Sequence, residues 1–567
     1  MLKTISVFCN LREKILIFIY LFFQLIVSLF EFITLSLIPL FILYIEDSEK
    51  AIIQLEHLRN YFNTNFFQLE INNLILSAFI FMIFALIIKN ILQIFISFLE
   101  GYIIKILVYS NTSKVFTNFI NQNLTYIISQ RSSDFLRRIT TDVSKAIGYL
   151  ICVLIIFKEV ILLSSILLAI FVNNITIGIL TLTLVSLLLL VILTFLNRKL
   201  KKKGKKSLES KTNIIEAVTN FIGIIKEIKI YKIENFFLNY FFKNLRIKLK
   251  NDMFKHIVSK IPRNIIEIFL IIFICCVLYF LNYSSSDSNN ILPTLGLFVV
   301  AMFRVIPIVT SINQSYAGLT YNKAIYLNIK NSIKSLNSSS EVNFKYENRP
   351  LIKEFKKLSF SNLNFSYDQT KLFQKFNFFI KKNKINGIIG KSGSGKSTLL
   401  NIIIGLIKPQ TVDIKIDEKK LENKNYKLDG MIGYVPQDIF LINGTILENI
   451  ALGIDKKKLD KDRINDIARD TCIIEMFKNS NLNYDCLVSD RGLNLSGGQR
   501  QRIGIARALY REPDYLLLDE ATNQLDNKTK IKILENIKLK YNNITTIIVS
   551  HDEDIKKICD NIITLDI

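Results

Sequence analysis

The chain has 567 residues, half of them hydrophobic, and a formal net charge of +24. The charge does not by itself indicate a nucleic-acid partner. Basic residues are frequent throughout, and the densest run, 198–206, directly follows an apolar segment, as the cytoplasmic flank of a membrane span does. None of the seven cysteines has a CxxC spacing, so the sequence predicts neither a zinc site nor a disulfide framework.

Six apolar stretches are long enough to cross a bilayer, since a spanning helix needs ~20 largely apolar residues. They are residues 15–44, 73–100, 147–172, 175–197, 263–282 and 291–313. The connections 101–146 and 198–262 are long and rich in Lys and Arg, whereas the two short external turns contain neither. The positive-inside rule therefore predicts that both termini and both long connections are cytoplasmic. Because these connections have helical patterns, we expect the spans to continue beyond the membrane.

The segment after the first span, SEKAIIQLEHLRNYF, has a helical apolar face. Ile52, Leu55, Leu58 and Phe62 recur at spacings of three, three and four residues. Two interpretations fit this pattern: a helix that lies flat on the outer membrane surface, or a cap that packs on the ends of the spans.

Ionisable residues also occur inside the spans. Lys158 and Glu159 are adjacent within the third span, and the others are Glu31, Lys89, Glu267 and Arg304. Charges in spans are costly, so they face a bundle interior, a watery cavity or a partner charge. Adjacent helical residues point ~100° apart. We therefore expect Glu159 to hold a neighbouring span and Lys158 either to pair with an acid such as Glu31 or to face a cavity.

The soluble part follows residues 331–345, which we interpret as a linker. Beyond it, short β-type runs alternate with helical patterns, which predicts a largely parallel sheet. The run Gly390-Lys391-Ser392-Gly393-Ser394-Gly395-Lys396-Ser397 follows an apolar strand and precedes a helical pattern that begins at Thr398. In this GxxxxGK[ST] motif, backbone N–H groups surround phosphates, the lysine reaches the β- and γ-phosphates, and the hydroxyl binds Mg²⁺.

Two further motifs accompany this loop. Residues 515–520, YLLLDE, form an apolar strand that ends in Asp519, placed to assist Mg²⁺, and Glu520, placed to polarise the attacking water. Residues 495–499 read LSGGQ. Here the chain resembles the ATP-binding cassette (ABC) family, for which this pentapeptide between a GKS loop and an LLLDE strand is very specific.

The resemblance implies further roles. Tyr367 would stack on adenine, Gln437 would sense Mg²⁺ and the γ-phosphate, Asp526 would end the loop 523–526, and His551 would contact the γ-phosphate. The implied catalytic residues are Glu520 and His551, and the implied Mg²⁺ ligands are Ser397, Gln437 and Asp519. The implied ATP-binding set is Tyr367, Gly390, Lys391, Ser392, Gly393, Ser394, Gly395, Lys396, Ser397, Thr398, Gln437, Ser496, Gly497, Gly498 and Gln499.

The chain departs from the family pattern at a few positions. Asn383 stands where Gly is usual, Asn523-Gln524 replaces the common Ser-Ala, and Asp552 replaces the common Arg. Asn also tolerates a left-handed turn, and neither of the other changes removes a reacting group. We therefore expect an active ATPase.

The predicted fold class is multi-domain: an all-α transmembrane domain of six spans over residues 1–330, the linker, and an α/β P-loop cassette over residues 346–567. In the ABC family, the GKS loop of one subunit meets the LSGGQ of another across ATP. The resemblance therefore implies a homodimer with two shared sites, ATP and Mg²⁺ as cofactors, and a multi-pass protein of the bacterial inner membrane with cytoplasmic cassettes.

Six spans ahead of the cassette and the runs GYVPQD (433–438) and NGTILENI (443–450) resemble the exporter branch. The membrane half is most similar to bacterial lipid-linked oligosaccharide flippases, which move undecaprenyl-pyrophosphate glycans. Basic residues occur at matching places near Lys89, Arg263 and Arg304. The resemblance implies that these three form an inward-facing surface for a pyrophosphate, whereas the alternative is that the charges in the spans only pair with one another.

Two other functions remain as alternatives. One is export of a different substrate, such as a drug, a peptide or a lipid A-like lipid. The other is a non-transporting ATPase that acts on nucleic acid or the ribosome, against which the six spans argue.

Overall fold

The computed structural model describes two compact units. The membrane unit comprises Met1–Gln122 and Tyr126–Asn343, and the cassette unit comprises Asn123–Thr125 and Phe344–Ile567. The described residues are 8–46, 71–122, 126–127, 130–173, 175–283, 291–347, 351–352, 355–367, 370–391, 393–421, 427–428, 430–480, 482–489 and 492–565. The predicted external helix over residues 48–62 and the turn 284–290 lie outside them.

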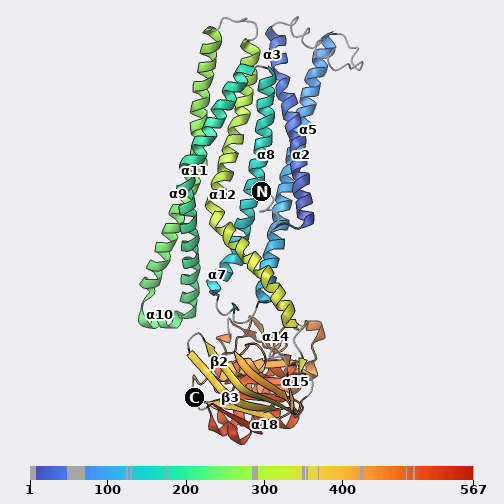
Figure 1. Cartoon of the computed structure of the whole chain (residues 1–567), viewed down its shortest axis with the longest axis vertical. Coiled ribbons are helices and arrows are strands. Elements are labelled where there is room, and N and C mark those ends of the chain that lie inside the picture. The colour runs from blue at the N-terminus through green and yellow to red at the C-terminus, as the bar shows by residue number, and fades with distance from the viewer. Residues whose placement is uncertain are drawn as a thin grey trace. The chain divides into compact units, whose positions relative to one another are not determined.

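The described part of the membrane unit is helical, and its long helices run side by side (Figure 1). The helices are α2 (Leu11–Ser36), α3 (Ile38–Glu46), α5 (Ile71–Ile120), α7 (Ser132–Arg137), the π-helical turn η1 (Arg138–Asp142), α8 (Val143–Asn173), α9 (Ile175–Gly223), α10 (Ile225–Tyr231), α11 (Glu234–Tyr283) and α12 (Ile291–Glu347). Helix α5 has 50 residues. At 1.5 Å per residue its length is roughly 75 Å, more than twice the ~30 Å hydrocarbon core.

Four described helical stretches are long and apolar enough to span a bilayer: Leu11–Glu46, Leu76–Ile120, Ser132–Asn173 and Gly296–Ile333. They overlap the first, second, third and sixth predicted spans. The fourth and fifth predicted spans fall within α9 and α11, where several side chains lie outside the described residues.

The surface and the interior of this bundle are both apolar. Phe18, Ile94 and Phe98 are each at least 70% exposed, whereas Tyr20 and Val27 are buried among α2, α5 and α8. An apolar exterior on long helices fits a hydrocarbon solvent.

Residues 331–345, expected to be a linker, are instead the last turns of α12, which continues to Glu347. Extending an existing helix adds one hydrogen bond for each residue fixed and avoids the cost of nucleation, so a polar sequence can continue a long helix. The domain boundaries drawn from the sequence remain a prediction.

The cassette unit contains two larger sheets. The parallel sheet has the order β13-β4-β12-β11-β8, and the antiparallel sheet has the order β3-β2-β5-β6. The strands of the first are β4 (Ile385–Gly390), β8 (Ile432–Val435), β11 (Tyr515–Asp519), β12 (Thr545–Ser550) and β13 (Asn561–Leu565). Those of the second are β2 (Lys357–Tyr367), β3 (Thr370–Lys381), β5 (Thr411–Ile416) and β6 (Lys419–Lys420).

Short elements complete the cassette unit. Its helices are α13 (Lys396–Ile403), α14 (Ile446–Ile450), α15 (Lys461–Asp470), α16 (Ile473–Asn479), α17 (Gly497–Tyr510), α18 (Asn527–Lys540) and the 3₁₀ turns η3 (Lys456–Lys458) and η5 (Glu553–Lys557). Two small sheets pair β1 (Leu351–Ile352) with β7 (Lys427–Leu428) and β9 (Gly444–Thr445) with β10 (Leu487–Val488).

The parallel sheet forms the centre of the cassette unit, as the alternating pattern predicted. Every residue of β11 and β12 is buried. Such continuous burial is typical of parallel strands covered on both faces. Carboxyl ends of parallel strands meet at one edge, so the segments that follow β4, β8, β11 and β12 lie close together.

Candidate functional site

The phosphate loop connects β4 to α13. Gly393 and Gly395 have φ of 83° and 87°, in the left-handed region that favours glycine. A Cβ on Gly395 would also lie 2.9 Å from side-chain atoms of Leu372 and Phe373. The loop thus needs glycine at these positions to turn tightly and to direct its N–H groups at a ligand at the start of α13. Ser392, part of the same motif, lies outside the described residues.

Lys396 begins α13 and is only 5% exposed. Its ammonium donates to the carbonyls of Gly390 and Lys391 at 3.0 and 2.8 Å and lies 3.6 Å from Glu520 Oε1. The hydroxyl of Ser394 is buried and has no hydrogen-bond partner among the described residues. A buried cation and an unsatisfied hydroxyl on one loop are the groups that phosphate oxygens would satisfy, so the loop fits a nucleotide triphosphate.

Asp519 ends β11 and contacts two hydroxyl groups. Ser397 Oγ donates to Oδ1 at 3.1 Å, and Tyr434 OH lies 3.4 Å from Oδ2. Burial raises the pKa of Asp519, the neighbouring Glu520 adds to the increase, and the bond from Ser397 opposes it. A divalent cation would offset the cost of the buried charge, and hydroxyl and carboxylate oxygens are ligands that Mg²⁺ accepts.

Glu520 is held in an unusual backbone conformation. Its φ is 51°, and its N–H donates to the carbonyl of Val549 at 3.0 Å. Two amides fix its carboxylate, because Gln437 Nε2 and Asn523 Nδ2 lie 2.8 and 3.3 Å from Oε2. A non-glycine residue in this region costs of order 1–3 kcal/mol and is typical of functional sites. Gln437, predicted as a Mg²⁺ ligand, is thus bound to Glu520 in this structure.

Asn523 is a site residue that the sequence motifs do not predict, because they mark it only as a departure from Ser. Its position three residues after Glu520 in a tight turn is the signal that could have identified it, because the turn folds its amide back onto the carboxylate. The other departure, Asp552, forms an ion pair with Lys530 of α18, and this contact lowers the pKa of Asp552.

His551 and Tyr367 complete the predicted nucleotide contacts. His551 follows β12 directly and is exposed at the carboxyl edge of the parallel sheet, beside the segment that follows β4. Tyr367 ends β2, and its side chain lies outside the described residues.

The LSGGQ segment caps α17. Ser496 and Gln499 exchange hydrogen bonds, with Ser496 N donating to Gln499 Oε1 at 2.8 Å and Gln499 N donating to Ser496 Oγ at 3.3 Å. A Cβ on Gly497 would lie 2.0 Å from Gln524 Oε1. The capping box satisfies the N–H of Gln499, whereas the N–H groups of Gly497 and Gly498 in the first turn have no partner within the helix.

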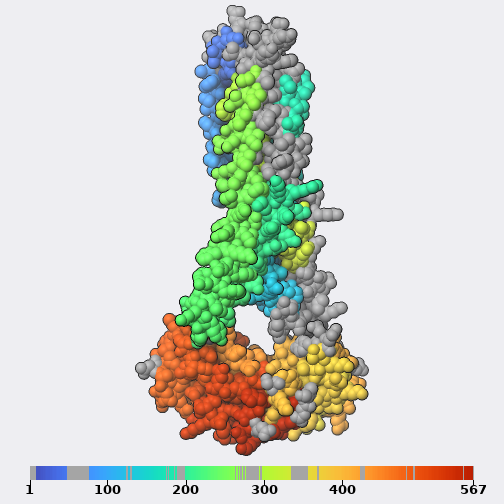
Figure 2. All heavy atoms as spheres, turned by 90° about the vertical axis from the view of Figure 1, so that its left-hand side faces the viewer, coloured from blue at the N-terminus to red at the C-terminus, as the bar shows by residue number. Residues whose placement is uncertain are grey.

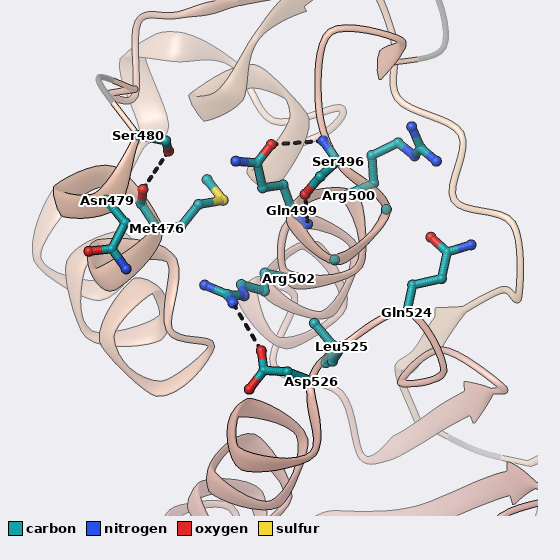
Figure 3. A pocket seen from close by; sticks show the side chains of 12 residues that line it. Met476, Asn479, Ser480, Ser496, Gln499, Arg500, Arg502, Gln524, Leu525 and Asp526 are labelled. Atoms are coloured by element: carbon teal, nitrogen blue, oxygen red, sulfur yellow. Dashed lines mark hydrogen bonds and ion pairs between the residues drawn. The ribbon is translucent and has the colours of Figure 1, made fainter.

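A cavity of about 720 Å³ opens in front of this helix start (Figure 3). It is lined by Met476, Asn479, Ser480, Ser496, Gly497, Gly498, Gln499, Arg500, Arg502, Gln524, Leu525 and Asp526. Among these described lining residues none belongs to the phosphate loop. The two halves of the predicted ATP site therefore line different surfaces of one chain.

Two of the three predicted substrate bases lie together in the membrane unit. Lys89 of α5 donates to Glu31 Oε2 of α2 at 2.6 Å, and Arg304 of α12 pairs with Oε1 of the same carboxylate. Arg263 does not share this carboxylate and pairs with Glu267 instead, so the three-base surface stays a prediction. Its Nε lies 3.0 Å from Oε1 of Glu267, one turn along the same helix, a spacing at which side chains meet on one helix face.

The adjacent charges of the third span, Lys158 and Glu159, form an ion pair with each other, and Glu159 also contacts a second helix. Glu159 accepts a hydrogen bond from Ser311 of α12 at 2.9 Å, so it does hold a neighbouring helix, as expected. Lys158 does not pair with Glu31, whose two oxygens are taken by the other bases. Its ammonium lies 3.8 Å from Glu159.

Comparisons with known proteins agree with this geometry. The family described as ABC transporter matches residues 373–523. The chain is 27% identical to an export ATP-binding/permease protein of Rickettsia bellii over 83% of this chain and 82% of that protein. It is 35% identical to the lactococcin-G-processing and transport ATP-binding protein LagD of Lactococcus lactis, over 33% of this chain and 26% of that protein.

A solved structure shares the fold. The structure of a bacterial Atm1-family ABC exporter with ATP bound superposes with a TM-score of 0.75, covering 98% of this chain and 94% of that chain at 19% identity. The predicted fold class, a helical membrane domain followed by an α/β cassette, is thereby confirmed.

Proposed function

We propose, from the premise that the chain is an ATP-binding cassette exporter of the half-transporter type, that its cargo is an anionic amphiphile, with a polyprenyl-pyrophosphate-linked glycan as the specific candidate. The chain couples ATP hydrolysis to transport. The observation that supports an anionic cargo is the pairing of two cations, Lys89 and Arg304, with a single carboxylate inside the bundle.

Each side chain at the proposed ATP site would have a distinct role. Lys396 and the N–H groups of its loop would bind the β- and γ-phosphates, and Ser397 and Asp519 would hold Mg²⁺, which supplies positive charge when bound. Glu520 would orient and polarise the attacking water. Gln437 and Asn523 hold the carboxylate of Glu520, so the base is already oriented before water arrives.

His551 would contact the γ-phosphate from the end of β12. Its place at the carboxyl edge of the parallel sheet, the edge where β4 leads into the phosphate loop, supports this role.

We further propose that the active form is a homodimer. The cavity before α17 is lined by LSGGQ residues and by no described residue of the phosphate loop, so the phosphate loop of a second chain would complete it. Each dimer would then contain two shared ATP sites. The proposed location is the bacterial inner membrane, with the cassettes in the cytoplasm.

The charge balance inside the bundle supports the anionic cargo. Glu31 is buried, and its two partners leave one positive charge in excess. Arg304 is the more exposed of the two, with 29% of its side chain accessible, and a guanidinium has five N–H donors, more than one carboxylate oxygen can satisfy. A phosphate-type anion would satisfy the remaining donors.

Other cargoes remain as test outcomes. The relative whose name includes a peptide product, LagD, matches only a third of this chain, so its name provides no argument about the membrane unit. A drug or peptide without negative charge would make no use of the excess cation beside Glu31.

The test is transport by the purified full-length chain in proteoliposomes. Fluorescent lipid-linked oligosaccharide should move between leaflets when ATP is present, and Glu520→Gln protein, in which water is not polarised, should move none. Transport of a drug or peptide panel without any movement of lipid-linked anions would contradict the proposal.

A further inference from the structure

A polar stripe runs along α11, outside the charges already described. Its members recur at helical spacings of three and four residues: Asp252, Lys255, His256, Ser259, Lys260, Arg263, Asn264 and Glu267. At 1.5 Å per residue the stripe extends roughly 22 Å. It begins in the long basic connection and ends just inside the predicted fifth span. Helices α9 and α11, coloured green, make up much of the face of the membrane unit shown in Figure 2.

Two adjoining cavities follow this stripe. The first, about 720 Å³, lies among α8, α11 and α12, and the second, about 570 Å³, continues along α11. They share His256, Ser259, Lys260 and Gln314. Both volumes fall within the range of small-molecule sites.

The first cavity is rich in cations that have no carboxylate within ion-pair distance among the described residues. Lys145 of α8 and Lys255 and Lys260 of α11 line it, and within the described part of the chain none of them forms an ion pair. The carboxylate that lines it, Asp252, is engaged by hydroxyl groups, because Tyr321 OH donates to Oδ1 at 2.5 Å and Ser207 Oγ at 3.2 Å.

The positive charge extends to the neighbouring helix α9. The pKa of Lys211 falls to about 8, first because it is buried and then because Lys145 and Lys248 lie near it, although Asp142 opposes the shift. Like charges gathered this closely repel one another unless an anion is present.

The wall of the first cavity formed by α8 leaves free space beside Gly148. A Cβ added to Gly148 of α8 would meet nothing within 4 Å, so the groove has room beside the lysines. Farther along, Ile257 and Ile261 line the second cavity, which places apolar surface next to the polar stripe.

We infer that this groove binds a polyvalent phosphate-type anion through Lys145, Lys255 and Lys260 before it reaches the cations inside the bundle. The inference rests on the proposed anionic cargo and adds a separate cytoplasmic-side site to it. Three ammonium groups against one carboxylate favour an anion with at least two charges, and the adjoining isoleucines fit the first part of a lipid tail.

The test is residue-resolved acylation of lysines in the full-length protein in nanodiscs, with inorganic pyrophosphate as the first probe. Pyrophosphate should protect Lys145, Lys255 and Lys260 but not Lys250, which is exposed and lies off the stripe. Because labelling is read at each lysine, pyrophosphate bound at the ATP site does not interfere.

Two kinds of variant distinguish specific binding of pyrophosphate in the groove from non-specific protection of lysines. Lys255→Gln/Lys260→Gln should raise the pyrophosphate concentration that half-protects Lys145 by about tenfold or more, since two charge-assisted contacts are lost. Gly148→Leu fills the open space beside the lysines without removing charge, so it should also raise the pyrophosphate concentration that half-protects Lys145. Lys250→Gln is the matched control and should change nothing.

A second arm identifies the source of the anion. Protection by a polyprenyl pyrophosphate in the nanodisc, but not by soluble pyrophosphate, assigns the site to a lipid headgroup, whereas protection by both assigns it to the phosphate group itself. Equal labelling with and without either probe, or unchanged protection in the double variant, overturns the inference.

The anion site in the groove and the proposed cargo are tested independently. If the protein flips lipid-linked oligosaccharide but neither probe protects these lysines, the proposed function stands and the anion site is contradicted. If the lysines are protected but no lipid is flipped, the anion site stands and the proposed cargo is contradicted.

Discussion

Removing the carboxylate of Glu31 should destabilise the membrane unit substantially. Its side chain is 6% exposed and Lys89 is 13% exposed, so Glu31→Gln would leave an ammonium and a guanidinium close together without their counter-charge. Removal of one partner from a buried ion pair costs about 3–5 kcal/mol. At about 2 °C per kcal/mol for a large unit, the unfolding midpoint should fall by roughly 6–10 °C.

A second substitution separates charge from packing. Lys89→Met in the Glu31→Gln protein removes one of the unpaired cations while keeping a long apolar side chain. The double variant should therefore be more stable than Glu31→Gln alone, although each single change is destabilising. The matched control is Glu234→Gln, which breaks the exposed pair with Lys229 and should leave the midpoint unchanged within error.

The assay is thermal unfolding of the detergent-solubilised, nucleotide-free protein, followed by the loss of the monodisperse peak in size-exclusion chromatography. A Glu31→Gln midpoint within 1 °C of wild type would refute the reasoning. So would a double variant that is less stable than both single variants, because the two cations would then not be competing for one carboxylate.

Three further predictions concern the ATP site. Asn523→Ala removes one of two amides from Glu520 and should lower steady-state ATPase turnover by roughly 3- to 10-fold without changing dimer yield; unchanged turnover would contradict its role. Heterodimers of Lys396→Ala and Ser496→Arg chains should contain one intact site and regain ATPase activity that neither homodimer has, whereas activity independent of dimer formation would exclude shared sites. Asp519→Asn should raise the midpoint of the nucleotide-free protein at pH 7, since burial raises the pKa of Asp519 above its unfolded value and the ionised carboxylate costs stability above that pKa. The gain should shrink as the pH falls through the folded pKa in a thermal unfolding series, and a gain that does not vary with pH would exclude this cause.

That Lys396, Asp519 and Glu520 lie close together follows from the sequence, because each belongs to a contiguous motif at the end of a parallel strand, whereas their roles toward ATP stay a prediction. Once β4, β8, β11 and β12 are parallel neighbours, the segments after them must meet, whatever the rest of the chain does. Local backbone chemistry was equally predictable. Asn383, which replaces the usual Gly, has a φ of 54°, in the left-handed region that asparagine tolerates.

The partners of the membrane charges could not be predicted in the same way. Composition identified Glu31, Lys89 and Arg304 as costly, but their pairing depends on how three helices from distant parts of the chain are rotated toward one another. Arg263 shows the opposite case. Its partner Glu267 lies four residues along the same helix, so this ion pair is predictable from spacing alone.

The two groups of cations differ in how their charge is balanced, and their positions relative to the predicted spans account for the difference. Lys145, Lys255 and Lys260 lie just before the predicted third and fifth spans, where water can solvate ammonium groups that have no carboxylate partner. Lys89 and Arg304 lie within predicted spans, where a cation needs a partner charge, and both share Glu31. An anion that passes from the groove to the inner pair must compete with a carboxylate there. Binding would therefore be strong at entry and weaker inside, which is the order that favours release on the far side of the membrane.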